Sequence, residues 1–349
     1  MEIKRYSDLE QIAPSVDLGV VAKSLPDIIR YKDIRTTEIP RPDVLVEGLL
    51  HRGCKLILGG TSKSNKSWSL LDLAMSVATG QPWWGLETRR TAVMYLNFEL
   101  QPAFLKERVL CIAGARPGFD QDSLDTNLLV WNLRGHNADV TLLRPQLEAQ
   151  LAANPVGLII LDPAYKLLGD RDENANGEIA DLMNQFEALA SSTGAAIAIA
   201  HHFAKGDSTA KNAIDRMSGA GAWARDPDAI MILTPHEEDD HFTCNSILRN
   251  FARMEDFVLR WEWPLMIRAD GLNPDALRRP QAKNKICTDR DFIDTLLEAE
   301  PQPPSAIITK ASHCLSMSKP TTQRYLSRLS KAKLIGSHAG MYWKITENN

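Results

Sequence analysis

The segment from Cys54 to Gly80 constrains the fold most, because an aliphatic run, a loop of small residues and an amphipathic run follow one another without a gap. Lys55–Leu58 is mostly aliphatic and predicts a buried strand, while Ser67–Thr79 has apolar residues at helical spacing. The loop between them matches the phosphate-loop pattern G-x-x-x-x-G-K-[ST] except at its second glycine. The loop residues are Gly60, Thr61, Ser62, Lys63, Ser64, Asn65, Lys66 and Ser67.

These residue types suit phosphate binding for a physical reason. Successive backbone N–H groups at the start of a helix form a concave donor site for phosphate oxygens. Lys66 then lies against the β- and γ-phosphates of ATP, and the Ser67 hydroxyl joins the Mg²⁺ shell. Asn65 stands where the pattern has glycine, and asparagine is among the few other residues that tolerate a positive φ. The alternative is an ordinary strand-to-helix turn with two incidental lysines.

Length and composition place the chain among ordinary globular proteins. Its 349 residues suffice for one large α/β domain and a small one. The formal net charge of -4 means that any nucleic-acid surface is local. The five cysteines are scattered without a C-x-x-C pair, which argues against a disulfide framework and a zinc site. With no signal-like N-terminus and no run near the ~20 apolar residues of a membrane span, we expect a cytoplasmic protein that does not enter a membrane.

Two acids stand at the ends of predicted strands. Thr91–Phe98 predicts a strand that ends at Glu99, and the carboxyl ends of parallel strands are where α/β folds place reactive groups. We therefore expect Glu99 to polarise an attacking water, unless it is only an exposed loop glutamate. Pro155–Pro163 contains a near-continuous aliphatic run that ends in Asp162, which we expect on the Mg²⁺ side of the site. The alternative for Asp162 is a strand that merely ends at an Asp-Pro turn.

A pair of histidines follows another predicted buried strand. Ala195–Ala200 runs into His201 and His202, where a histidine can hydrogen-bond a γ-phosphate; the alternative is a core histidine with its bonds satisfied. The next segment, Phe203–Ser218, is long and contains Gly and Ser, and such loops inside compact domains tend to be functional. Its basic residues are Lys205, Lys211 and Arg216.

The chain divides into four predicted parts. Residues 1–43 are a lead-in, either an arm that packs on a neighbouring subunit or a strap over the chain's own sheet edge. Residues 44–270 form the large α/β domain, and 271–285 form a linker with two prolines and mixed charge. Residues 286–349 read as three helices and a small hairpin, which is a winged-helix pattern.

The third helix of this C-terminal pattern is basic. It is predicted over Ser318–Ala332, with Lys319, Arg324 and Arg328 facing outward. A basic helix in this position fits a DNA groove, and the alternative is a protein contact or a solvated surface.

The motifs taken together resemble the RecA-like P-loop ATPases of the RepA hexameric helicase type, often described as AAA-family ATPases. The resemblance covers Val44–Arg268 and rests on GGTSKSNKSWSLLDLAMSVATG, YLNFE, LIILDPAYKLLGDRDEN, AIAIAHHFAKG and SGAGAWARDPDAIMIL in that order. It implies an α/β fold with a twisted, mostly parallel sheet and a ring, expected to be hexameric, whose sites lie between subunits. It also implies ATP and Mg²⁺ at Lys66 and Ser67, catalysis by Glu99, Asp162 beside Mg²⁺, and His201 as the sensor of the γ-phosphate.

The resemblance has implications for partners as well. Such rings complete each site with a basic residue from the neighbour, for which the candidates are Arg249 and Arg253, with Arg225 third. The loop after His201 corresponds to the segment that contacts single-stranded DNA, which gives Lys205, Lys211 and Arg216 a role. The winged helix is an addition to the minimal helicase, and its basic third helix separately gives duplex DNA as its expected partner.

The sequence therefore predicts a DNA-dependent ATPase, a ring-forming helicase or replication protein of a mobile element. The second hypothesis is an ATP-gated DNA-binding regulator or initiator with little or no unwinding. A third, a small-molecule phosphotransferase, lacks an evident acceptor site and leaves the basic C-terminal helix unexplained.

Overall fold

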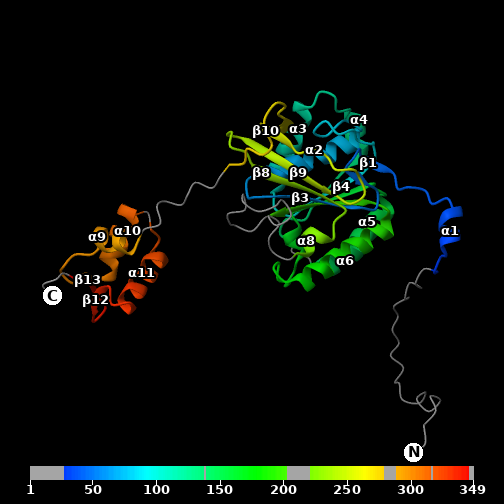
Figure 1. The fold of residues 1–349 in the computed structure, drawn as a ribbon. Coiled ribbons are helices and arrows are strands. Elements are labelled where there is room, and N and C mark those ends of the chain that lie inside the picture. The colour runs from blue at the N-terminus through cyan, green and yellow to red at the C-terminus, as the bar shows by residue number, and fades with distance from the viewer. Residues whose placement is uncertain (1–26, 137–138, 203–220, 279–287, 316, 346–349) are drawn as a thin grey trace, which may run out of the picture. The chain divides into compact units, whose positions relative to one another are not determined.

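The structure is a computed structural model that describes residues 27–136, 139–202, 221–278, 288–315 and 317–345 (Figure 1). The chain divides into two compact units, Met1–Pro42 and Asp43–Asn349. The sequence also predicts one or two short helices around Ser7–Ile12 and Asp17–Arg30, and these ranges lie wholly or largely outside the described residues. None of the helices in the described part of the chain combines the length and hydropathy that a membrane span requires.

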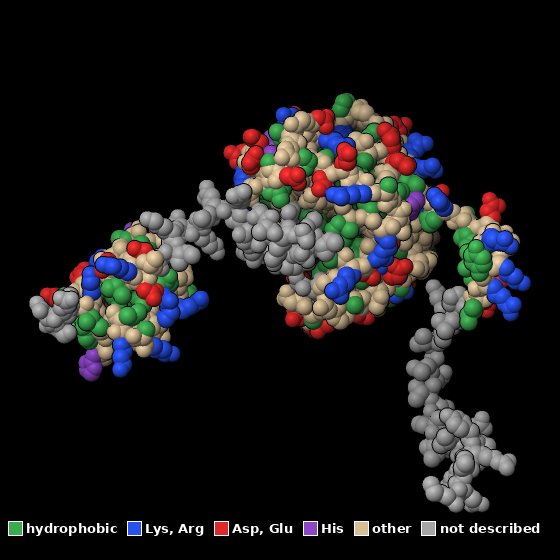
Figure 2. All heavy atoms as spheres, in the orientation of Figure 1, with side chains coloured by type: hydrophobic (Ala, Val, Ile, Leu, Met, Phe, Trp, Pro, Cys, Tyr) green, Lys and Arg blue, Asp and Glu red, His purple; other side chains and the backbone are tan. Residues whose placement is uncertain are grey.

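The described part of the first unit is short and exposes apolar side chains. It contains the helix α1 (Tyr31–Thr36), none of whose residues is buried. Ile28, Tyr31 and Ile34 are all at least half exposed. Figure 2 shows the hydrophobic side chains on one side of α1 and Lys and Arg side chains on the other.

The core of the second unit is a nine-stranded sheet of order β11-β10-β9-β8-β3-β7-β6-β4-β5. The strands from β8 to β5 in this order pair in parallel, and β9, β10 and β11 are added antiparallel at one edge. This is the mostly parallel α/β sheet of a RecA-like core, as predicted. The strands are β3 (Lys55–Gly60), β4 (Val93–Asn97), β5 (Leu128–Asn132), β6 (Leu158–Asp162), β7 (Ala196–His202), β8 (Ala229–Pro235), β9 (His241–Leu248), β10 (Phe257–Glu262) and β11 (Leu265–Arg268).

Helices cover both faces of this sheet (Figure 1), which explains why its central strands are nearly uninterrupted aliphatic runs. One face packs on α2 (Lys66–Thr79), α3 (Pro102–Ala115) and α4 (Gln121–Asn127). The other packs on α5 (Val140–Ala153), the 3-10 helix η2 (Ala164–Leu167), α6 (Asn176–Thr193) and α8 (Ala222–Arg225).

The order of the strands brings the predicted functional segments to one edge. The parallel strands β3, β4, β6 and β7 end there, and each is followed by, or ends in, one of those segments. In the register of the sheet Asn97 lies beside Asp162, and Gly60 lies beside His202. The phosphate loop, Glu99, Asp162 and the histidine pair therefore lie along the same edge.

Residues 273–278, inside the predicted linker, hydrogen-bond to the sheet. The N–H of Glu237 donates to the carbonyl of Ala276 at 2.8 Å, and the N–H of Arg278 donates to that of Pro235 at 3.0 Å. The Thr243 hydroxyl donates to the carbonyl of Pro274 at 2.8 Å. This part of the segment therefore packs with the core and does not behave as a free connection.

The C-terminal segment, residues 288–345, has a small core of its own. Its elements are α9 (Asp289–Leu296), α10 (Pro304–Leu315), α11 (Lys319–Lys331) and the antiparallel hairpin β12 (Ile335–His338) and β13 (Met341–Lys344). Phe292, Leu296 and Leu329 are fully buried in this core. Helix α9 begins with a capping box, in which Thr288 and Asp291 each bond the other's backbone N–H.

Candidate functional site

The phosphate loop turns into α2 through a left-handed residue. Asn65 has φ 57° and ψ 25°, the conformation that glycine usually supplies at this point. Gly60 is needed for another reason, because a Cβ there would lie 2.6 Å from Ser64 Oγ and 3.0 Å from the carbonyl oxygen of Leu233. The Ser64 hydroxyl donates to the carbonyl of Thr61 at 2.8 Å and closes the turn. The backbone is therefore shaped as the motif requires despite the substitution.

Lys66 is buried in this loop and bonded to the loop's own backbone. Its ammonium donates to the carbonyls of Gly60 at 3.0 Å and Thr61 at 2.8 Å, and to Ser64 Oγ at 3.2 Å. Burial lowers the pKa of Lys66 to about 8, against the attraction of the Asp162 and Glu99 carboxylates. Phosphate oxygens would supply the negative charge that this buried ammonium lacks.

Asp162 ends β6 and is buried with two hydroxyl donors. The Tyr95 hydroxyl of β4 donates to Asp162 Oδ2, and the Ser67 hydroxyl also bonds the carboxylate. Burial raises the pKa of Asp162, while the bonds from Tyr95 and Ser67 act in the opposite sense. Carboxylate and hydroxyl oxygens are the donors that Mg²⁺ prefers, so Ser67 and Asp162 together fit that ion.

Glu99 is exposed just after β4, and two other residues set its position. Asn97 Oδ1 accepts from the backbone N–H of Leu100 at 2.9 Å and from that of Glu99 at 3.3 Å. The Tyr165 hydroxyl, from η2, donates to Glu99 Oε1. The backbone at Glu99 is thus fixed by Asn97 of the same strand, and its side chain is held by Tyr165, which follows the neighbouring strand β6.

These groups surround one cavity of about 260 Å³. Five predicted loop residues line it together with both predicted acids. Gly60, Thr61 and Ser62 belong to the loop but are not among the lining residues. Trp68 and Arg108 line it without having been predicted, and His202 lines it as the second member of the predicted histidine pair. The lining is Lys63, Ser64, Asn65, Lys66, Ser67, Trp68, Glu99, Arg108, Asp162 and His202.

Arg108 adds positive charge to the cavity from α3. Its guanidinium lies over the Trp68 ring, 4.7 Å from the centroid, which fixes both side chains in a cation–π contact. The sequence offered no signal for Arg108, since one arginine in an amphipathic helix is usually a solvated residue.

The structure separates the two histidines, because His202 lines the cavity and His201, the predicted sensor, does not. Side chains alternate along β7: Ala200 packs on the α2 face and Ile199 on the opposite face, which His201 shares. His201 is stacked on Trp223 of α8 with ring centroids 4.2 Å apart, and burial lowers its pKa to about 3. Strand periodicity was the available signal that distinguishes the two.

The arginines proposed to act on a neighbouring subunit lie outside the cavity lining. Arg249 follows β9, and its Nη2 donates to the carbonyl of Arg225 at 2.6 Å. Its backbone N–H bonds the carbonyl of Asp228, just before β8, at the edge opposite the phosphate loop. Arg225 is exposed at the end of α8.

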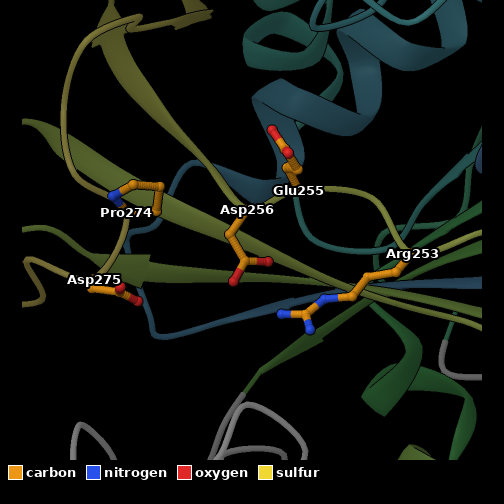
Figure 3. Close-up of a pocket in the computed structure, with 5 residues that line it drawn as sticks. All are labelled: Arg253, Glu255, Asp256, Pro274 and Asp275. Carbon is orange, nitrogen blue, oxygen red and sulfur yellow. The ribbon is translucent and has the colours of Figure 1, made fainter.

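Arg253 extends into a second cavity of about 470 Å³ (Figure 3). Its other lining residues are mainly acidic: Glu255, Asp256, Pro274 and Asp275. The role of Arg253 in a neighbouring subunit's site stays a prediction.

The residues predicted to contact DNA divide into two groups. Lys205, Lys211 and Arg216 lie outside the described residues. Lys319 and Arg324 are exposed on α11. Arg328 is exposed too, but it pairs with Asp289 and lies over the Tyr325 ring at 4.7 Å, so its charge is partly neutralised. Lys and Arg side chains are visible on the surface of the C-terminal segment in Figure 2.

A phosphate loop between a central parallel strand and a helix, with acids at the ends of two neighbouring strands, defines a P-loop nucleotide-binding protein with a RecA-like sheet. The model of the family described as AAA domain matches residues 25–208, and the chain belongs to this family. Membership places it among the AAA-type P-loop ATPases.

Among solved structures, a KaiC-like protein from the hyperthermophilic archaeon Pyrococcus horikoshii OT3 is similar, with 12% sequence identity and a TM-score of 0.45. The match covers 64% of this chain and 93% of that one. No curated protein matches the chain.

Proposed function

We propose that the protein hydrolyses ATP in a DNA-dependent manner, as a ring-forming helicase or replication protein of the RepA type. The observation that carries the proposal is the convergence of Lys66, Ser67, Glu99 and Asp162 on one cavity. A binding protein needs the phosphate loop alone, whereas hydrolysis also needs a base within reach of the attacking water.

The proposed chemistry follows from the positions of these groups. The loop N–H groups bind the phosphate oxygens, and the Lys66 ammonium exchanges backbone carbonyls for phosphate. Ser67 and Asp162 would hold Mg²⁺, which would neutralise charge on the β- and γ-phosphates. Glu99 accepts a proton from the attacking water while the oxygen of that water bonds to the γ-phosphorus. The bond between the γ-phosphorus and the β–γ bridging oxygen breaks, and ADP and phosphate leave.

The assembly is proposed from the resemblance of the motifs to ring-forming ATPases. Arg249 or Arg253 of one subunit would stabilise charge on the phosphoryl group in the next subunit's site, within a hexameric ring. Within its own chain, His202, which lines the cavity, would bond the γ-phosphate.

DNA is the proposed partner at two places. Lys205, Lys211 and Arg216 would contact single-stranded DNA, and the C-terminal segment would act as a winged helix on duplex DNA. The order of three helices and a hairpin, with exposed Lys319 and Arg324 on the third helix, supports the second contact.

The deciding experiment measures ATP turnover by the full-length protein at low salt, with and without single-stranded DNA, because electrostatic contacts weaken as salt rises. Stimulation by single strands is expected. Turnover that ignores DNA, or ATP binding without turnover, would instead favour an ATP-gated DNA-binding regulator.

Two variants separate binding from hydrolysis. Lys66→Ala removes the phosphate contact, so both ATP binding and turnover should be lost. Glu99→Gln keeps the shape of the side chain but not the base, so ATP should still bind while turnover falls by about 10²- to 10⁴-fold. Equilibrium binding of a fluorescent ATP analogue and steady-state turnover measure the two effects, and wild-type turnover in Lys66→Ala would contradict the assignment of the loop.

A further inference from the structure

We propose that Tyr165 is a positioning residue, which holds the Glu99 carboxylate at the mouth of the phosphate cavity. The inference rests on the proposed hydrolysis of ATP and adds a residue to its machinery. Tyr165 is 66 residues from Glu99 in sequence, and its hydroxyl donates to Glu99 Oε1.

The Tyr165 side chain comes from a firmly anchored turn. Its neighbours in η2, Ala164 and Leu167, are fully buried among the residues on the α5 and α6 face of the sheet. The turn starts two residues after Asp162, and the N–H of Leu168 closes it on the Tyr165 carbonyl at 3.3 Å. The hydroxyl is therefore presented from the same strand end that carries Asp162.

The Glu99 side chain, in contrast, has little else to hold it. It is exposed, and among the described residues Tyr165 is the one group that hydrogen-bonds its carboxylate. A free glutamate side chain samples many rotamers, and a general base works only within hydrogen-bond reach of its proton. Removing the Tyr165 hydroxyl should therefore leave the Glu99 side chain free to sample several rotamers, without changing the phosphate contacts.

The surroundings of Tyr165 favour its role as a donor. Burial and the neighbouring carboxylates raise the pKa of Tyr165, so the phenol keeps its proton at neutral pH. The Lys166 ammonium lies over its ring at 5.0 Å, and the ring of His202 is 6.2 Å away. The ring is thus placed between Glu99 and the histidine of the cavity.

The test is Tyr165→Phe in the full-length protein, which removes the hydroxyl and keeps the ring. We expect kcat to fall about tenfold, as for the loss of a hydrogen bond to a charged group, with KM and the Kd of a fluorescent ATP analogue unchanged within about twofold. The matched control is Tyr31→Phe, the same change at a side chain 79% exposed on α1, which should leave kcat unchanged.

A second background shows whether Tyr165 acts through Glu99. In Glu99→Asp the carboxylate is shorter by one methylene and no longer reaches the phenol, so adding Tyr165→Phe should change kcat by less than about twofold. An equal loss of kcat in both backgrounds would overturn the proposal, as would a rise in kcat in Tyr165→Phe alone.

The same assays separate this inference from the proposed function. If wild type hydrolyses ATP and Glu99→Gln does not, the proposed chemistry is supported. In that case an unchanged kcat in Tyr165→Phe contradicts only the positioning role of Tyr165. If wild type shows no turnover, or Glu99→Gln retains it, both proposals fall.

Discussion

At the scale of single residues, Asn65 accounts for the departure of the loop from its pattern. The motif demands glycine where the chain turns with positive φ, and asparagine has a smaller steric penalty there than other residues with a Cβ. The conformation is retained, so the substitution changes the sequence pattern but not the shape of the phosphate cradle.

Two substitutions at position 65 test this explanation. Asn65→Gly should keep ATP affinity, with the free energy of unfolding within about 1 kcal/mol of wild type. Asn65→Val should lose roughly 1–2 kcal/mol or more and bind ATP more weakly, because a β-branched residue resists positive φ. Urea unfolding and ATP binding measure both, and equal behaviour of the two variants would contradict the explanation.

Residues of the site were predictable to different degrees. Lys66, Ser67, Glu99 and Asp162 could be found because loop chemistry and strand ends are local signals in the sequence. Tyr165 and Arg108 could not, since their roles depend on which strands become neighbours and which helix face covers the loop. His202 lies between these cases, because the two-residue period of a strand distinguishes it from His201.

At the scale of elements, α2 is unusual in being buried on almost every side. It lies among α3, α4 and the sheet, and left-handed residues adjoin both of its ends, Asn65 and Gly80. Its burial extends to a charged residue, Asp72, which is 1% exposed. Arg116 Nε lies 3.6 Å from Asp72 Oδ1, and among the described residues neither carboxylate oxygen has a hydrogen bond.

This burial makes stability depend on pH. Burial raises the pKa of Asp72 to about 6 from its usual 3.8, so the folded protein holds this proton more tightly than the unfolded chain. The stabilisation is complete below pH 3.8 and is lost as the pH rises through about 6. Asp72→Asn should therefore stabilise the protein at pH 8 by on the order of 2–3 kcal/mol and have little effect near pH 4.

Urea unfolding at the two pH values measures the difference. Asp122→Asn, at an exposed acid of α4, is the control and should show no such dependence on pH. Destabilisation by Asp72→Asn at both pH values would show that the contact with Arg116 outweighs the cost of burying the charge.

Elements were predictable where the sequence shows a clear apolar run or period. The sequence predicts a helix over Pro102–Ala115 and a strand over Leu128–Asn132, and these are the bounds of α3 and β5. It also predicts antiparallel strands over Phe242–Arg249 and Phe257–Trp263, which correspond to β9 and β10. The missed elements are short, and they include α1, α4, η2, α8, β11 and the hairpin of β1 (Val44–Val46) and β2 (Leu50–His51). Such segments show no clear period, and their structure depends on the neighbours that they pack against.

At the scale of the whole molecule, charge is unevenly distributed. The residues from Pro301 onward carry seven Lys and Arg against one acid, in a chain of net charge -4. Neutralising DNA phosphates releases counterions, so the affinity of a DNA-binding surface falls with salt more steeply when it neutralises more phosphates. The proposed winged helix can therefore be tested through the salt dependence of binding.

Replacing both Lys319 and Arg324 by alanine in the full chain should weaken binding to duplex DNA. The slope of log affinity against log salt should become shallower by about 1 for each phosphate that the variant no longer neutralises. Arg290→Ala is the control, since this side chain is 92% exposed on α9, outside the proposed recognition helix. If Arg290→Ala and the double variant bind equally well at every salt concentration, α11 is not the surface that binds DNA.

Each of the two tyrosines of the site hydrogen-bonds an acid that belongs to the other tyrosine's strand. Tyr95 of β4 bonds Asp162 at the end of β6, and Tyr165, just beyond β6, bonds Glu99, just beyond β4. Each acid thus relies on a hydroxyl that lies more than sixty residues away in the sequence. Such partners should be retained together as related sequences diverge. A lineage that loses one tyrosine should also show a changed acid or a new hydrogen-bond donor beside it. Position 95 should therefore covary with position 162, and position 165 with position 99.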